Sequence, residues 1–574
     1  MQISTAVRNA IRKYAVKNAT DYGRANEGAV LSKIISLHPE LKGDIKSLAL
    51  EVKKEVAEVN SLDKHKLKEE YLKHEEEFNQ AQAKKAEASA KHNFSIEGAE
   101  KGSFATRFPP EPGGYMHIGH AKPVFIEDEL RRVYEGKLML YFDDTNPDNE
   151  RQEFVDMFKE DLKWLGIRFD AEYYASDNIP TLYRYAEQAI KKGKAYVCTC
   201  SEDLIKENRS AGRGCDHREQ GIEDNIGMWR KMLAGEFKHS EAILRIKADM
   251  SSLNTTMRDP TVFRIKHAKH YRQGTKYFVW PTYDFCTPIM DSTKGITDAI
   301  RSKEYELRDE LDFTILDILG LRKPRIISFS RLEIADNVTS KRKIRELVSS
   351  KMIEGYDDPR LVTIRALKRR GIKPQAIKEF ALSFGLGKGE SVVELEVLLN
   401  INRKIIDPVA KRLFFIEKPS QLHIEGMEQE QEISLRLHPT AQLGHRKYRP
   451  SDKLLIDESE ALKLRPGDLV RLKEAYNIKI TKVEKGAVSA EYAHDQKPAA
   501  QKLRWMNEEG SVKCELWGIG KLFTDGAFNK DSISKKDGYA EGYASKLNVD
   551  DIVQFEAFGY YKLDSHKQMR FISL

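Results

Sequence analysis

Hydrophobic positions in the first part of the chain follow a helical period. Over residues 1 to about 60, apolar side chains recur at Ile11, Tyr14 and Ala15 and again at Leu48 and Val52. Residues 64–91 consist mostly of Lys, Glu, Ala and Gln with few apolar positions, which is typical of a solvated helix or a flexible linker. We therefore predict an N-terminal helical appendage with a charged linker over residues 1–95.

The pattern changes to mixed strands and helices over residues 96–340. A strand-like run at 104–108 is followed by a Pro/Gly turn, a helical segment at 119–136 and a strand-like run at 137–142. Strand, helix and strand in this order are typical of a parallel α/β sheet. A charged segment at about 198–274 interrupts this pattern. We interpret it as a domain inserted into a Rossmann-like α/β domain.

The remaining chain divides into a helical and a β-rich part. Residues 341–420 contain several runs with helical spacing, and from residue 421 to 574 short runs of alternating polar and apolar residues dominate, broken by Gly and Pro-Gly. This alternation favours antiparallel β-barrels. The predicted fold is thus multidomain: a helical appendage, an α/β domain with an insertion, a helical connecting region and C-terminal barrels.

Composition narrows the class of protein. A chain of 574 residues should hold several domains, at roughly 100 to 200 residues each. With 40% hydrophobic and 32% charged residues, fibrous and wholly disordered classes are excluded. An apolar run of about 18 residues, as needed to cross a membrane, is absent, and so is the apolar core of a signal peptide. We expect a cytoplasmic protein without a membrane partner. The net charge of +7 permits an anionic partner without identifying one.

Three of the five cysteines lie close together. Cys198, Cys200 and Cys215, with His217, offer three sulfurs and one imidazole, a complete tetrahedral set for structural Zn²⁺. Such clustering favours a metal over disulfides. The alternative is that Cys198 is an ordinary buried strand residue. A zinc held by four protein ligands would stabilise the insertion and take no part in chemistry.

The segment 109–120, PPEPGGYMHIGH, links a predicted strand to a predicted helix. Its prolines stiffen the turn, and Gly113 and Gly119 allow a ligand to approach the backbone closely. The free N–H groups of a helix start favour phosphate. His117 and His120 are three residues apart, hence on one helix face, and can donate to phosphate oxygens. The alternative is a Gly/Pro turn with ordinary histidines.

A second polar loop, Val338-Thr-Ser-Lys-Arg-Lys343, lies far downstream. Lysines there could reach the β and γ phosphates of a nucleotide, although the loop alone could also be a solvated basic segment. Together, the two loops resemble the HIGH and KMSKS signatures of class I aminoacyl-tRNA synthetases. The strings TRFPPEPGGYMHIGHAK, YFDDTNPDNE, WPTYDF, SFSRLEI and GYDDPRLVTIRALKRRG extend the resemblance over residues 101–574. They are similar to the glutamyl and glutaminyl subgroup in its archaeal and eukaryotic form.

The resemblance implies a reaction and its residues. An amino acid would be activated with ATP, accompanied by Mg²⁺, to an acyl-adenylate and then passed to tRNA. His117, His120 and Lys341 would be catalytic. The residues that would bind ATP are Glu111, Pro112, Gly113, His117, Gly119, His120, Arg331, Leu332, Thr339, Ser340 and Lys341. The amino acid would be bound by Arg107, Asp143, Tyr283 and Arg301. Two positions depart from the family pattern, since Tyr141 stands where arginine is common and Thr339 where Met or Leu is usual.

Arg301 favours glutamate over glutamine. A buried carboxylate needs a cation, and a guanidinium offers a bidentate fork. The resemblance implies arginine at this position in the glutamate enzymes and a small uncharged residue in the glutamine enzymes. The alternative for Arg301 is a surface ion pair with Glu304 or Glu306. We predict ligation of L-glutamate to tRNA-Glu, the alternatives being a glutaminyl-tRNA synthetase or a non-catalytic tRNA-binding paralogue.

The same resemblance assigns the other partners of the chain. The insertion would hold the acceptor end of tRNA, and the barrels would read the anticodon, with Arg446, Arg449, Arg504 and Trp505 as candidates. Residues 1–95 would dock tRNA or a protein partner. Whether tRNA-Gln is also glutamylated stays open.

Overall fold

The structure, a computed structural model, describes residues 4–22, 24–38, 41, 45–74, 94–389, 391–426, 432–449, 451–493 and 497–574. The chain divides into two compact units, Met1–Ser95 and Ile96–Leu574. Each unit is described by itself. Among the described residues, no helix combines the length and the apolar character needed to span a bilayer.

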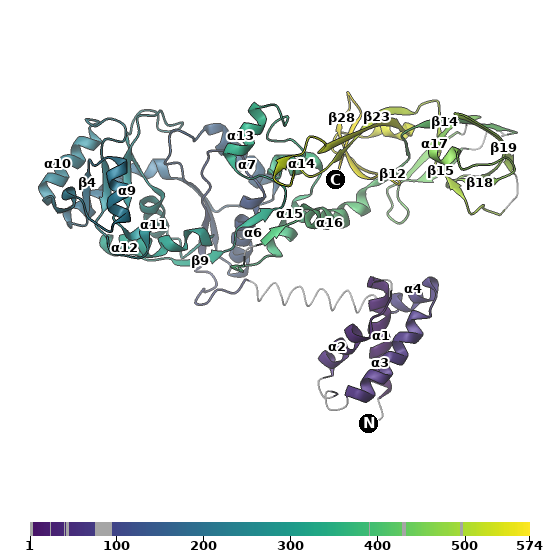
Figure 1. The fold of residues 1–574 in the computed structure, drawn as a ribbon, viewed down its shortest axis with the longest axis horizontal. Coiled ribbons are helices and arrows are strands. Elements are labelled where there is room, and N and C mark those ends of the chain that lie inside the picture. Colours follow the sequence, from purple (N-terminus) through teal and green to yellow (C-terminus); the bar gives the residue numbers. More distant parts are fainter. Residues whose placement is uncertain are drawn as a thin grey trace. The chain divides into compact units, whose positions relative to one another are not determined.

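The first unit is a small bundle of helices (Figure 1). Its elements are α1 (Thr5–Tyr22), α2 (Glu27–Leu37), α3 (Ile45–Asn60) and α4 (Lys64–Leu72). The apolar positions expected at helical spacing form its core, where Ile11, Ala15, Val52 and Val56 are buried. The predicted helical period of residues 1–60 is therefore found. Of the charged segment, residues 64–72 are helical, and 75–93 lie outside the described residues.

A parallel sheet forms the start of the second unit. β1 (Ala105–Phe108), β2 (Lys137–Phe142) and β3 (Ala171–Tyr174) pair in this order, and α6 (Ile118–Val133) and α7 (Gln152–Trp164) make the connections. β8 (Asp298–Ser302) and β9 (Arg325–Phe329) form a second parallel pair. The backbone N–H of Thr297, just before β8, donates to the carbonyl of Ala105 over 2.9 Å, so β8 lies beside β1. The carboxyl ends of β1, β2 and β8 therefore meet, as expected at a ligand site of a doubly wound sheet.

An antiparallel sheet separates β3 from β8 in the sequence. It consists of β4 (Ala195–Cys198), β5 (Ile243–Ile246), β6 (Thr261–Ile265) and β7 (Val279–Pro281), paired in this order. α8 (Ile179–Lys191) precedes it, α9 (Glu202–Ser210) and α10 (Ile222–Leu233) lie between β4 and β5, and α11 (Tyr283–Thr293) follows directly. α12 (Asp309–Leu319) packs against α11. The antiparallel sheet thus begins three residues before the predicted start of the insertion at residue 198.

Helices follow the second half of the parallel sheet. They are α13 (Lys341–Ser349), α14 (Ile364–Arg370), α15 (Pro374–Leu382) and α16 (Leu395–Ile406), and the short strands β10 (Leu332–Ile334) and β11 (Ser391–Val393) pair in parallel. α14 begins at the N-cap Thr363, whose hydroxyl accepts from the N–H of Ala366, and ends at Gly371 with a φ of 94°. The helices predicted for residues 341–420 are found up to Ile406, whereas Lys411–Leu413 and Phe415–Ile416 in the same range are strands.

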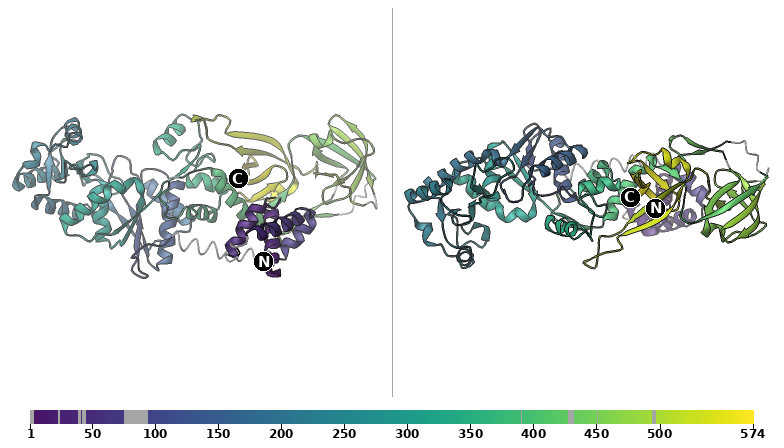
Figure 2. Two further views of the ribbon diagram at one scale, coloured as in Figure 1. Left: turned by 60° about the horizontal axis from the view of Figure 1, so that its bottom comes forward. Right: turned by 90° about the horizontal axis from the view of Figure 1, so that it is seen from above.

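Two seven-stranded sheets make up the C-terminal part (Figure 2, green to yellow). One sheet has the order β12-β27-β28-β29-β23-β26-β13 and the other β21-β18-β19-β20-β14-β17-β22. Their strands are β12 (Lys411–Leu413), β13 (Phe415–Ile416), β14 (Pro419–Glu425), β17 (Lys453–Asp457), β18 (Leu469–Leu472), β19 (Asn477–Glu484), β20 (Ala487–Ala493), β21 (Lys502–Leu503), β22 (Met506–Asn507), β23 (Val512–Ile519), β26 (Ile533–Ala540), β27 (Ile552–Phe555), β28 (Gly559–Ser565) and β29 (Arg570–Ser573). Two-stranded pairings add β15 (Ile433–Arg436) with β16 (His445–Tyr448) and β24 (Phe523–Thr524) with β25 (Ala527–Phe528).

The pairing in these sheets is mixed. Within the described residues, β12 with β27, β14 with β20, β18 with β21 and β23 with β29 are parallel, and the other pairs are antiparallel. The prediction of antiparallel barrels was therefore wrong for these four pairs. Period-two alternation shows which face of a strand is buried, but it carries no information about the direction of the neighbouring strand.

Candidate active site

The turn between β1 and α6 is closed by its own two histidines. His117 is the N-cap of α6, and its Nδ1 accepts a hydrogen bond from the backbone N–H of Gly119 over 3.1 Å. The backbone N–H of His117 donates to Nδ1 of His120 over 3.2 Å. This is the reciprocal arrangement of a capping box with histidine at both places. It fixes both rings at the start of the helix, with their centroids 3.9 Å apart.

Both histidines are neutral at physiological pH. Burial, reinforced by the positive charge of Lys341, lowers the pKa of His117 to about 3, and burial places the pKa of His120 well below its ordinary value. Because each Nδ1 accepts a backbone hydrogen bond, each Nε2 carries the ring hydrogen. The turn therefore presents two neutral N–H donors, as expected for contacts to phosphate oxygens.

The downstream lysine loop lies directly against this turn. Nζ of Lys341, the first residue of α13, is 3.2 Å from Oε2 of Glu111. A Cβ atom at Gly113 would lie 3.3 Å from Nζ of Lys341, and one at Gly114 would lie 3.0 Å from its Cγ and Cδ. The paired glycines thus leave the space in which the lysine side chain crosses the turn. The two signatures, far apart in sequence, are brought together.

A cavity of about 620 Å³ collects most of the predicted residues. Its lining includes Arg107, Glu111, His117, Gly119, His120, Asp143, Tyr283, Arg301, Arg331, Leu332, Thr339 and Lys341. Gly113 lines a small adjoining cavity with Lys341 and Thr339. Pro112 and Ser340 line neither. Pro112 accepts the N–H of Arg151 through its carbonyl, and Ser340 is the N-cap of α13, so they hold the two loops in shape.

Two buried arginines lie at one end of the cavity. Nε of Arg107 donates to Asp291 over 2.8 Å and Nη1 donates to the carbonyl of Ile300 over 3.0 Å. Its Nη2 has no hydrogen-bond partner among the described residues. Arg301, on β8, is 6% exposed and is paired with Asp309 and with Asp312, whose Oδ2 lies 2.6 Å from Nη1. The alternative of a surface ion pair with Glu304 or Glu306 is excluded by this burial and by these partners.

Among the described residues, the partners of Arg301 orient its guanidinium but do not occupy all of its N–H donors. Burial raises the pKa of Asp312 to about 7, against the opposing effect of Arg301. Against the lowering effect of burial, the charges of Asp312 and Asp309 raise the pKa of Arg301, so the guanidinium stays protonated. Nε of Arg301 has no hydrogen-bond partner within the described part of the chain. Tyr283, the first residue of α11, also lines the cavity. Burial raises the pKa of its hydroxyl against the opposing charges of Arg107 and Arg301, so the hydroxyl stays protonated. This end of the cavity suits an acidic group.

Carboxylates line another part of the same cavity. Asp143 follows β2, and its backbone N–H donates to the carbonyl of Pro110 over 3.1 Å. Burial and the nearby charge of Glu111 raise the pKa of Asp143 to about 6, so it is ionised at neutral pH. Burial raises the pKa of Glu150 to about 9, so this carboxyl is protonated there. The ionised carboxylate of Asp143 suits an ammonium group.

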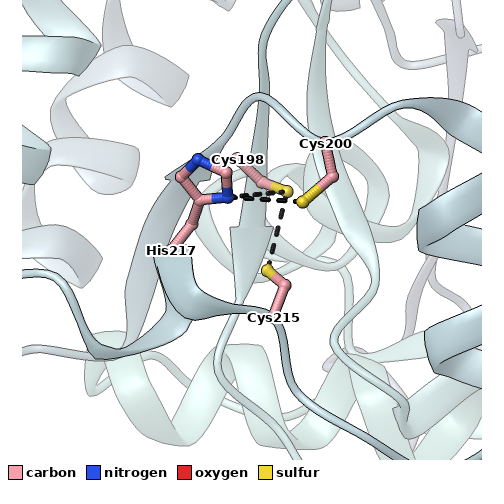
Figure 3. Close-up of side chains that lie close together, drawn as sticks. All are labelled: Cys198, Cys200, Cys215 and His217. Carbon is pink, nitrogen blue, oxygen red and sulfur yellow. Dashed lines mark hydrogen bonds between the residues drawn. The ribbon is translucent and has the colours of Figure 1, made fainter.

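The four metal-ligand candidates meet in the insertion (Figure 3). One ligand atom from each of Cys198, Cys200, Cys215 and His217 lies within 4.8 Å of all the others. The sulfurs of Cys198 and Cys215 are 3.8 Å apart, and Nδ1 of His217 is 3.3 Å from the sulfur of Cys200. A tetrahedral zinc with Zn–S bonds of about 2.3 Å needs sulfurs about 3.8 Å apart. The donor set and its spacing therefore fit zinc.

Comparison with known families identifies the chain. Residues 103–407 match the catalytic domain of the class I tRNA synthetases (E and Q), the glutamate and glutamine enzymes. Residues 410–495 and 502–564 match the two anticodon-binding domains of the same synthetases. The chain belongs to this family.

Individual relatives of this synthetase cover nearly its whole length. The glutamate--tRNA ligase of Nitrosopumilus maritimus (strain SCM1) is 39% identical over 98% of this chain and 99% of that protein. The glutamate--tRNA ligase of Thermococcus kodakarensis is 37% identical over 99% of each. A crystal structure of a glutamate tRNA ligase from Elizabethkingia meningosepticum aligns with 17% identity and a TM-score of 0.39, over 53% of this chain and 70% of that one.

Three of the four anticodon-reading candidates of this synthetase make contacts within the protein. Arg446 is 3% exposed and its Nε lies 2.8 Å from Oε1 of the buried Glu541. Trp505 is 2% exposed and its Nε1 donates to the carbonyl of Lys473. Arg504 is held by Glu460 over 3.0 Å. Arg446 and Trp505 are therefore core residues, whereas Arg449 is exposed.

Several cavity residues of the synthetase escaped the sequence reasoning. Arg264 and Arg308, from β6 and the turn before α12, line the cavity beside Tyr305 and Glu127. None of them belongs to the two signature loops, and they come from three elements: Arg264 from β6, Glu127 from α6, and Tyr305 and Arg308 from the turn Lys303–Arg308. The string YFDDTNPDNE did contain the lining residues Asn146 and Glu150, and its carboxylates and amide were the available signal.

Proposed function

We propose that this synthetase ligates L-glutamate to tRNA-Glu through a glutamyl-adenylate, releasing AMP and pyrophosphate. The observation that carries the proposal is the burial of Arg301 in the cavity that also holds the histidine turn and the lysine loop. A guanidinium in that place forms a bidentate, charge-assisted pair with a side-chain carboxylate, which a neutral amide cannot form. The names of the curated relatives, glutamate--tRNA ligases, support the choice.

In the proposed reaction, the histidine turn and the lysine loop serve ATP. The Nε2–H groups of His117 and His120 would donate to phosphate oxygens as charge develops, and Lys341 would move from Glu111 to the β and γ phosphates as pyrophosphate leaves. Glu111, Pro112, Gly113, Gly119, Thr339 and Ser340 would shape the phosphate end, and Arg331 and Leu332 would flank the adenosine. Mg²⁺ would accompany the phosphates and help to neutralise their charge. No protein nucleophile is needed, because the substrate carboxylate attacks the α-phosphate.

The other residues of the cavity would bind glutamate. Asp143 would hold the ammonium group and Tyr283 would hydrogen-bond the amino acid from the opposite wall. Arg301 would receive the side-chain carboxylate, and the unpartnered Nη2 of Arg107 offers a second donor. Positioning and charge stabilisation would thus provide most of the catalysis.

The remaining parts would bind tRNA and protein. Residues 96–340 would form the catalytic domain with the insertion at about 198–274, which would hold the acceptor end and a structural Zn²⁺ on Cys198, Cys200, Cys215 and His217. Residues 341–420 would contact the stem and residues 421–574 the anticodon. Residues 1–95 would form the appendage that docks tRNA or a protein partner. The cytoplasm, where ATP and tRNA meet, would be its location.

ATP–pyrophosphate exchange tests the proposal. Glutamate and glutamine are each supplied with and without tRNA, and we expect exchange only with glutamate plus tRNA. Arg301→Ala should lose at least about a hundredfold in kcat/KM for glutamate, because it leaves a buried carboxylate unpaired. Arg322→Ala, which removes an arginine outside the cavity, is the matched control. A preference of the unmodified protein for glutamine would overturn the assignment.

A further inference from the structure

Among the described residues, the buried guanidinium of Arg245 has no carboxylate partner. It lies on β5, is 1% exposed, and its Nε donates to the backbone carbonyl of Asp259 over 2.8 Å. Within the described residues, no carboxylate oxygen lies within 4.0 Å of its nitrogens, and Nη2 has no hydrogen-bond partner. A buried charge that is not paired costs several kcal/mol, so an anion is expected beside it.

The adjacent carboxylate of Asp259 is already engaged. Its Oδ2 accepts from Nε of Arg218 over 2.8 Å and from the hydroxyl of Tyr196 over 2.9 Å. Its Oδ1 accepts from the N–H of Ala248 over 2.8 Å. Asp259 therefore balances Arg218, and the charge of Arg245 has to be balanced from elsewhere.

The group that faces Arg245 is a sulfur of the metal-ligand cluster. Its Nη1 lies 3.9 Å from Sγ of Cys215. The pairing of β5 with β4 explains why the two groups are close. Arg245 lies directly opposite Tyr196 on β4, and β4 ends at Cys198. The Arg245 guanidinium also lies 5.5 Å from the centroid of the Tyr196 ring. The side chain is thus confined between an aromatic ring and the cluster.

Charge counting explains the arrangement. Three thiolates and a neutral imidazole around a divalent cation leave one negative charge on the centre. We propose that Arg245 is the counter-ion of this centre, pairing with the Cys215 thiolate and neutralising the excess charge in a buried place. This inference rests on the proposed zinc site. It makes Arg245 a positioning residue for the metal, while the four ligands alone coordinate it.

Zinc affinity of the full-length protein, measured by competition with a chromogenic chelator, tests the inference. We expect about one zinc per chain in the unmodified protein. Arg245→Met should weaken zinc binding by about 10- to 100-fold, the range found when outer partners of metal ligands are removed. Arg245→Lys keeps the charge and should lose far less. Arg258→Met is the control, since Arg258 lies in the same segment but donates only to backbone carbonyls.

The outcomes separate the two proposals. Absence of zinc from the unmodified protein overturns both the metal site and the counter-ion. Zinc in the unmodified protein, with equal affinity in Arg245→Met, overturns the counter-ion alone. Circular dichroism of each variant loaded with zinc checks the fold. If Arg245→Met does not fold, Arg245→Lys decides: affinity near that of the unmodified protein supports a role for charge, and a loss beyond tenfold contradicts it.

Discussion

Nζ of Lys341 and Oε2 of Glu111 lie 3.2 Å apart although 230 residues separate them in the chain. The contact joins the lysine loop to the histidine turn across the top of the cavity. It also gives the lysine a carboxylate partner that it has to leave before it can contact phosphate. The two signature loops are therefore held ready beside each other by an ion pair that can be exchanged.

Replacing this lysine should impair activation more than binding. Lys341→Ala removes a cation from the departing pyrophosphate, and we expect kcat for ATP–pyrophosphate exchange to fall by about 10²- to 10³-fold. Lys343→Ala is the matched control, because Lys343 lies on the same helix but contacts the Phe523 ring at 4.4 Å. Equal losses in both variants would show that general positive charge, and not this side chain, is what matters.

Gly119 should tolerate no side chain. A Cβ there would lie 2.9 Å from Cε1 and Nδ1 of His117, which is closer than real Cβ contacts. Gly119→Ala should therefore displace the His117 ring and break its capping bond, with a loss of about 10- to 100-fold in kcat/KM for ATP. Gly227→Ala, where the added atom meets nothing within 4 Å, is the control. Unchanged ATP kinetics in Gly119→Ala would contradict the assigned role of the turn.

The acidic limb of the pH profile of kcat/KM for glutamate should reflect the protonation of Asp143. With a pKa of about 6, this carboxyl loses its charge below that pH, and the substrate ammonium loses its partner. We expect kcat/KM for glutamate to fall about tenfold per pH unit below pH 6. The histidines add no step there, since the pKa of His117 is lowered to about 3 and that of His120 also lies well below its ordinary value. Asp143→Asn should flatten the limb, and an undiminished limb in that variant would refute the assignment.

Arg446 should affect stability and leave anticodon recognition nearly unchanged. Its pair with Glu541 is buried on both sides, and breaking such a pair costs about 3–5 kcal/mol. Arg446→Met should lower the Tm of the C-terminal part by about 6 °C or more. The Kd for tRNA, measured well below that Tm, should change less than about threefold. Arg449→Met, at an exposed position, should leave the Tm unchanged.

The sequence predicted most of what lies in continuous strings. In the Pro/Gly turn, the lysine loop and the cysteine cluster, residues close together in the sequence indicated the chemistry of the site. In the structure, the turn and the loop line one cavity, and the four cluster residues lie together. The positions that were missed, such as Arg264 and Arg308, come from single residues on separate elements. Their meeting depends on how the insertion and α12 pack, and periodicity does not record that.

The carboxylate partners of Arg301 and the anticodon-reading candidates were also beyond what local sequence patterns could predict. Asp309 and Asp312 orient Arg301 from the next helix, one turn apart, and no local pattern distinguished them from the acidic residues Glu304 and Glu306. Arg446 and Trp505 were chosen for residue type alone. In β16, Arg446 is buried between the exposed His445 and Lys447, but all three residues are polar, so no alternation in the sequence marks Arg446 as inward-facing.

The route from the insertion into the cavity is short. β7 ends at Pro281, and after a single threonine α11 begins with Tyr283, which lines the cavity. Because only Thr282 separates the two elements, we expect a shift of the antiparallel sheet along β7 to displace Tyr283 as well. Under the proposed function, an RNA end bound to the insertion would thereby change the position of a residue in the proposed amino-acid pocket. A fluorescent or NMR reporter at Tyr283 should register that loading before any adenylate forms.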